Sequence, residues 1–208
     1  MELTGFTASL SFPAKILGMD ILTAVRALNQ RAVREDWHHF IDPTLAFGDQ
    51  GYDQLLTLWR EKSGDRAMPR RSQITPRDLK DFLRNVLLFE REAQNPSRFR
   101  WRLIGTSLTG ILGEHTGKTF DESIPTQHLA RWQQCGDLIL DGGRPLRFLG
   151  RVHMNGREFL NAENLFVPLA NDQDEPAFIL GQCRYTPRTN EDGDAWENQI
   201  ASLPGGLL

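Results

Sequence analysis

Apolar and polar residues recur with two different periods along this chain, and the changes of period divide it into helices and strands. Residues 20–37 place apolar side chains every three or four positions, which predicts an amphipathic helix capped by Asp20. Residues 42–51 interrupt the pattern with proline and glycine and are interpreted as a linker. Further helices are predicted over 52–64 and, with Thr75 as N-cap, over 75–86.

After residue 86 the apolar positions alternate, as in a strand with one buried face. Residues 86–93 and 98–105 are predicted to form an antiparallel hairpin in which Phe99, Trp101 and Leu103 share the buried face. A short glycine-rich stretch and a long helix over 125–143 follow. Three more strands are then predicted, over 145–154, 157–170 and 177–185, and the first two of these are joined by an Asn-Gly turn at 155–156.

Two strands, a helical middle and three strands describe an α+β fold. We expect a five-stranded antiparallel sheet with helices inserted between the second and third strands, covering one face of the sheet. An N-terminal helical extension precedes it. From residue 187 the chain becomes polar and acidic, which predicts a flexible tail.

Composition narrows the class of protein. The chain has 208 residues, 39% hydrophobic residues and a net charge of −3, as in a globular protein with its own core. The N-terminal residues resemble neither a secretory signal nor a membrane span. Two isolated cysteines suit a reducing compartment, so we expect a cytoplasmic protein.

Charge is unevenly distributed. Residues 60–102 carry twelve Lys and Arg against six Asp and Glu. We interpret this block as a solvated face, with a docking surface for an anionic partner as the alternative. Nucleic acid is not expected as a partner, because the chain is acidic overall and has no motif that reads bases.

Three motifs resemble one bacterial subfamily of PAS domains, small proteins that often stand alone. The first is an M-P-x-R-x-x-I-x-P signature at Met68, Pro69, Arg71, Ile74 and Pro76. The second is an R-L-x-G-T turn at Arg102, Leu103, Gly105 and Thr106, and the third is the closing hairpin "ENLFVPLANDQDEPAFILG". The likeness covers about residues 52–186, which leaves 1–51 as an N-terminal extension with its linker and 187–208 as the tail.

The resemblance implies a sensor or adaptor in signal transduction that lacks catalytic residues and acts through protein partners. A ligand or partner would shift the packing between the sheet and its helices. We expect the N-terminal helix over 20–37 to transmit this shift, and its apolar stripe predicts a homodimer contact, with folding back onto its own sheet as the alternative.

Some PAS domains hold a ligand between sheet and helices. A cavity there is predicted to be lined by six residues, for each of which plain core packing is the alternative. They are Trp101, Leu103, Trp132, Phe148, Val152 and Ile179.

The sequence requires no cofactor, and we expect neither haem nor flavin. His128 and His115 are the candidates for a haem ligand, but neither lies in the apolar register of the long helix. Cys183 lies on the last strand, whereas the flavin-binding cysteine of photosensing PAS domains lies on a helix. No spacing of His, Cys or Asp is typical of a metal site. A haem- or flavin-binding sensor is kept as an alternative.

Two enzyme hypotheses compete with a sensor. "GEHTGKT" at 113–119 resembles a phosphate-binding loop, but it has three residues between its glycines where four are needed. We interpret its glycines as turns: Gly105 ends a strand, Gly113 caps a short helix and Gly117 takes a positive φ. A small-molecule enzyme would need ionisable groups in the cavity, for which Asp137 and Glu163 are the candidates.

Overall fold

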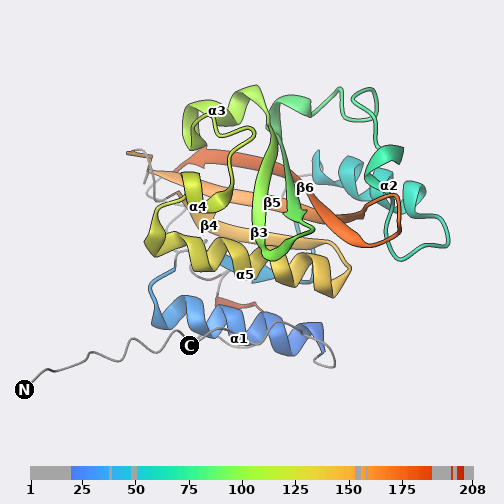
Figure 1. Cartoon of the computed structure of the whole chain (residues 1–208). Helices are drawn as coiled ribbons and strands as arrows, with labels where there is room; N and C mark the ends of the chain where they lie inside the picture. Colours follow the sequence, from blue (N-terminus) through green and yellow to red (C-terminus); the bar gives the residue numbers. More distant parts are fainter. Residues whose placement is uncertain are drawn as a thin grey trace, which may run out of the picture.

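The structure is a computed structural model that describes residues 20–37, 39–47, 51–152, 156–157, 159–188, 198 and 201–203. Its centre is a six-stranded antiparallel sheet with helices packed around it (Figure 1). The strands are β1 (His39–Asp42), β2 (Val86–Glu92), β3 (Asn95–Ile104), β4 (Leu146–Arg151), β5 (Leu160–Ala170) and β6 (Pro176–Pro187). Their order across the sheet is β1-β4-β5-β6-β2-β3, so β1 and β3 form its two edges.

Five of these strands and the helical insertion between β3 and β4 confirm the predicted α+β fold. Strand β1 was not predicted. It is only four residues long, too short for an alternating pattern, and it ends at Asp42, where the linker was expected to begin. Asn155, half of the predicted Asn-Gly turn, and most of the tail lie outside the described residues.

The helices are α1 (Ile21–Arg34), α2 (Gly51–Ser63), α3 (Thr106–Leu112), α4 (Phe120–Ser123) and α5 (Thr126–Gly142). Asp20 caps α1 as predicted, because its carboxylate accepts a hydrogen bond from the Leu22 amide at 3.2 Å. Gly143 caps the C-terminus of α5, and its left-handed φ of 61° lets its amide donate to two carbonyls of the last turn.

The helix predicted from Thr75 to Val86 is wrong. The segment is a series of turns that ends in a 3₁₀ turn, Leu83–Asn85. Its backbone bonds join residues three apart, including Phe82 N to Leu79 O at 3.0 Å and Asn85 N to Phe82 O at 2.9 Å. This tighter winding still buries Leu79 and Phe82, because residues three apart lie on one side of a 3₁₀ turn.

The sheet is covered on both faces, so the prediction of one covered face is wrong. On one face, the helix-side core joins strand residues such as Phe89, Phe166 and Ile179 to α1, α3, α4 and α5. On the other face, the α2-side core joins Leu165 and Val167 of β5 to α2 and the 74–83 segment. Helix α5 crosses the face of the sheet that carries the helix-side core, and α1 lies beside α5 (Figure 1).

A β-bulge in β3 decides which face Leu103 occupies. Leu88 pairs with Leu103, whereas the next residue, Phe89, pairs with Trp101, so Arg102 is an extra residue on β3. Trp101 therefore points into the helix-side core, while Leu103 packs against the α2-side core. The alternation that grouped these two residues on one face does not extend through the bulge.

Helix α1 is tied to the edge strand β1 by Asn29. Its side-chain amide donates to the Ile41 carbonyl at 2.9 Å and accepts from the Ile41 amide at 2.8 Å, and it is almost fully buried. These bonds satisfy outward backbone groups of an edge strand that would otherwise be open to pairing. The apolar stripe of α1, with Val25 and Leu28, is buried within the chain and does not form an open surface for a dimer.

Candidate functional site

A cavity lies between α5 and the sheet, within the helix-side core. Its volume is about 70 Å³. Strands β2, β4, β5 and β6 supply most of its apolar wall, with Leu87, Phe89, Phe148, Phe166 and Ile179. Because β5 and β6 are central strands, this wall is held by hydrogen bonds on both sides.

One face of α5 forms the opposite wall. The residues that line the cavity from this helix recur at intervals of three and four, as on one helix face. They are His128, Arg131, Trp132, Cys135, Gly136 and Ile139. Gly136 allows α5 to lie close to the sheet, since a Cβ there would approach the ring of Phe99 to 2.6 Å.

Aromatic rings close one end of the cavity. Phe89 packs edge-on against Trp101, Phe120 and Trp132, with ring centroids 4.8, 5.1 and 6.1 Å away. The Trp101 indole also donates to Ser123 at 2.9 Å, which fixes its orientation. Such interlocked rings form a rigid wall, because aromatic side chains have few rotatable bonds and prefer these angles.

Four of the six predicted ligand-binding residues lie where they were expected. Trp132, Phe148, Val152 and Ile179 line the cavity. Trp101 does not line it but packs behind Phe89 and Trp132. Leu103 lies on the other face of the sheet because of the bulge.

Polar groups at the cavity were missed by the sequence analysis. Arg131 lines it and is only 5% exposed. Asn164 faces it from β5 and His128 from α5, although His128 was placed outside the apolar register. Burial, and then the charge of Arg131, lower the pKa of His128. The shared spacing of His128, Arg131 and Cys135 is the signal in the sequence that could have revealed this face.

The described residues provide neither a reactive thiolate nor a group of metal ligands at this site. Burial raises the pKa of the Cys135 thiol to about 12 and raises that of Cys183 as well, so both remain protonated. The His115 ring lies 3.0 Å from the Leu112 carbonyl and packs near Trp101. Among the described residues, no three His, Cys, Asp or Glu side chains are grouped as a metal site would require.

The "GEHTGKT" segment does not form a phosphate cradle. The Gly117 amide donates to the Trp101 carbonyl at 2.8 Å, and the Lys118 amide to the His115 carbonyl at 2.9 Å. The Thr116 and Thr119 amides donate to the side chains of Glu114 and Glu122. These four amides are therefore engaged within the chain, whereas a phosphate-binding loop points such groups at its ligand.

The glycines act as the sequence indicated. Gly105 follows β3 directly, and a Cβ there would overlap the Arg84 carbonyl. Gly113 and Gly117 have φ angles of 94° and 88°, which glycine adopts without strain.

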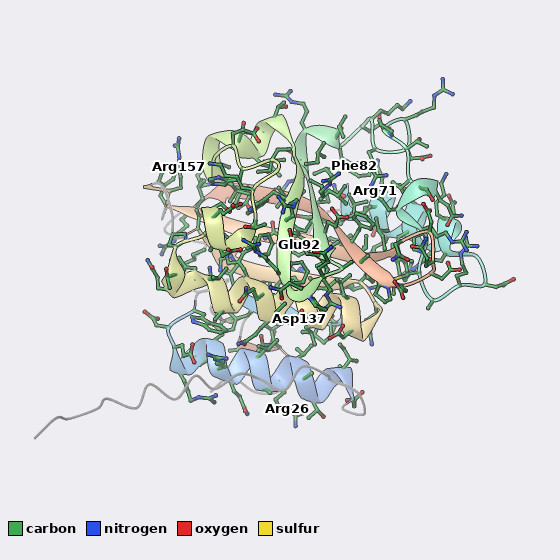
Figure 2. All side chains as sticks on the ribbon, in the orientation of Figure 1. Arg26, Arg71, Phe82, Glu92, Asp137 and Arg157 are labelled. Atoms are coloured by element: carbon green, nitrogen blue, oxygen red, sulfur yellow. The ribbon has the colours of Figure 1, made fainter. Side chains whose placement is uncertain are left out.

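The two carboxylates proposed for an enzyme lie far apart in the fold. Asp137 is on α5 (Figure 2). It pairs with Arg91 at 3.0 Å. Glu163 pairs with Arg147, and its carbonyl accepts from the Tyr52 hydroxyl of α2, on the opposite side of the sheet. Neither lines the cavity, so the structure does not bring them together for acid–base chemistry.

Many arginines of the basic block are paired. Arg91 binds Asp137 and Asp141, Arg98 binds Asp121 at 2.7 Å, and Arg102 binds Glu90 at 3.3 Å. This agrees with the interpretation of the block as a solvated face whose charge is balanced locally.

Comparison with known families decides the assignment of the fold. The sequence pattern described as "PAS domain" matches residues 49–184. The chain belongs to the PAS domain family. In this PAS domain, β2 and β3 precede the helical insertion, and β4, β5 and β6 follow it.

Solved structures similar to this PAS domain include two from bacteria. The PAS domain of Bordetella pertussis BvgS is 17% identical, with a TM-score of 0.41 over 73% of this chain and 99% of that one. A sensory box histidine kinase/response regulator from Burkholderia thailandensis is 16% identical, with a TM-score of 0.38 over 60% and 95%.

An RNA-binding light-oxygen-voltage receptor is 12% identical, with a TM-score of 0.41 over 79% of this chain and 42% of its own length. No curated protein matches the sequence. Within the described residues, no helix has both the length and the apolar character that crossing a membrane requires.

Proposed function

We propose that this PAS protein is a non-enzymatic sensory or regulatory component of bacterial signal transduction, and that a small ligand in the cavity under α5 controls its contact with a protein partner. PAS domains are generally sensory modules, and this membership supports the signalling role. The observation that carries the ligand is the cavity itself. It combines an apolar wall with a few polar groups, as small-molecule sites do.

The size of the cavity favours a small ligand over haem or flavin. A volume of about 70 Å³ has room for several water molecules, since a cavity needs at least about 10–15 Å³ to hold one. His128 is placed to approach a ligand, but a macrocycle would require the rings around Phe89 to move apart.

Helix α1 is the element that we propose as the output. Ile21 at its start packs against the helix-side core, and its side chain reaches Gly142 at the end of α5. A ligand that moves α5 would therefore change the packing of α1, and with it a surface available to a partner. The free thiols Cys135 and Cys183 support a cytoplasmic location.

The test is native mass spectrometry of the purified full chain, with an absorption spectrum of the same sample. We expect a mass excess from a small non-covalent ligand that disappears on denaturation, and no haem or flavin absorption. Cys135→Phe should lower the occupancy by filling the cavity, whereas Cys135→Ala at the same position should preserve it. Equal ligand occupancy in Cys135→Phe and the parent protein would contradict binding in this cavity.

A further inference from the structure

Arg131 is a buried cation that has no counter-ion among the residues that the structure describes. Its side chain lines the cavity and is 5% exposed. Within the described part of the chain this side chain makes no hydrogen bond, ion pair or stacking contact, although seven other arginines form ion pairs there. Arginine is almost never buried without a partner, because the desolvation of its charge is then uncompensated.

The neighbours of Arg131 on α5 do not supply a negative charge. Cys135 lies one turn away, but burial raises its pKa to about 12, so it is a neutral thiol. His128, on the other side, carries either no charge or a positive one, and burial lowers its pKa. Asp137 is directed to Arg91 instead and does not line the cavity.

Trp132 on α5 and Asn164 on β5 also line the cavity among the described residues. The indole nitrogen of Trp132 and the side-chain oxygen of Asn164 are buried and have no hydrogen-bond partner there. Trp132 can only donate, while the amide of Asn164 can donate or accept. Buried polar atoms are rarely left unpaired, so the cavity holds three polar positions that a ligand could satisfy.

We propose that the ligand is a small apolar monocarboxylic acid, bound with its carboxylate on Arg131 and its hydrocarbon body against the aromatic wall. A guanidinium binds a carboxylate through two parallel hydrogen bonds. Trp132 supplies a further donor. Phe148, Phe166 and Ile179 enclose the rest of the molecule. This inference rests on the proposed function, since it names the chemical class of the ligand for the same cavity.

The experiment compares acids with neutral molecules of the same shape. Calorimetry on the full chain, refolded to remove any co-purified compound, measures the affinity for benzoate and benzamide, and for hexanoate and hexanamide. We expect benzoate and hexanoate to bind about 10- to 100-fold more tightly than their amides, as the loss of a charge-assisted hydrogen bond implies. This comparison needs no variant.

Substitution of the arginine provides the second arm. Arg131→Met keeps an unbranched side chain of similar length and should abolish the preference for acids over amides. The matched control is Arg26→Met, an exposed arginine of α1 that lies away from the cavity (Figure 2). It should preserve the preference. A preference that persists in Arg131→Met would overturn the proposal.

The outcomes separate this inference from the proposed function. Equal affinity for acids and amides would overturn the carboxylate assignment, while ligand binding in the cavity would stand. Absence of binding by all four probes would also overturn the carboxylate assignment. A neutral compound found by native mass spectrometry would then show that ligand binding by the protein stands without it.

Discussion

The Arg147 guanidinium of β4 lies 2.9 Å from the Asp42 carboxylate of β1, and both side chains are almost completely buried, at 3% and 2% exposed. Glu163 binds the same guanidinium from β5. The other oxygen of Asp42 accepts from the Thr44 amide and hydroxyl at 2.8 and 2.6 Å. This ionic group therefore connects three adjacent strands and fixes the chain as it leaves β1.

Breaking this buried pair should cost much more than breaking a surface pair. We expect Asp42→Asn to lower the free energy of unfolding by about 3 kcal/mol, because it leaves Arg147 with only part of its compensation. Asp174→Asn breaks the Arg70–Asp174 pair, which is 37% and 49% exposed, and should cost much less, because solvent screens an exposed pair. Urea unfolding of both variants measures the difference, and equal losses would contradict the burial argument.

Two glycine-to-alanine substitutions should have opposite effects. At Gly136 a Cβ would press on the Phe99 ring, and overpacking costs about 1–3 kcal/mol. At Gly110 in α3 nothing lies within 4 Å, so alanine should stabilise the helix by up to about 1 kcal/mol. Thermal unfolding of the two variants is the measurement. A stabilised Gly136→Ala would show that α5 does not approach β3 this closely.

Asp137 should make stability depend on pH between about 4 and 6. Burial raises its pKa to about 6, against the opposing effect of Arg91 and with a smaller contribution from Asp141. Between these pH values the folded protein binds a proton that the unfolded chain has released. The stability that protonated Asp137 adds is therefore complete below pH 4 and is lost as the pH rises through 6.

The measurement is the free energy of unfolding across this range. Asp137→Asn should flatten the decline in stability from pH 4 to 6. Asp141→Asn removes the same charge one turn away, from a residue that also binds Arg91, and should keep most of the decline. If the two variants have the same profile, the decline does not come from Asp137.

Asn29 should protect the backbone of the edge strand. Asn29→Leu removes both hydrogen bonds to Ile41 and should accelerate amide exchange at that residue, with a loss of about 1–3 kcal/mol. Gln30→Leu, at the exposed neighbouring position, should leave the exchange at Ile41 unchanged. Unaltered exchange in Asn29→Leu would mean that another group protects this edge.

The elements that the sequence predicted well have strong periodic patterns. Phe99 and Trp101 alternate with arginines, and the apolar stripe of α1 recurs over four turns. Strand β1 has only four residues, so its pairing with β4 could not be distinguished from a loop. The two-sided burial of the sheet was visible in principle, because Leu165–Leu169 is a continuous apolar run typical of a strand buried on both faces.

The cavity was predicted only in its apolar part, since hydrophobic spacing identifies a buried face but not the polar groups within it. Leu103 was assigned to the wrong face because one inserted residue in β3 reverses the alternation and leaves no mark in the sequence. Arg131 was missed because a charged residue on a helix is ordinarily solvated. Only the packing of α5 against β5 and β6 shows that this one is enclosed.

Occupancy of the cavity should change the packing of α1. Hydrogen exchange followed by mass spectrometry tests it on the full chain, with and without saturating benzoate, and in Cys135→Phe against Cys135→Ala without ligand. We expect altered exchange in α5 and in α1, over Ile21–Arg34, with little change in α2. Exchange in α1 that is the same in all four samples would contradict it.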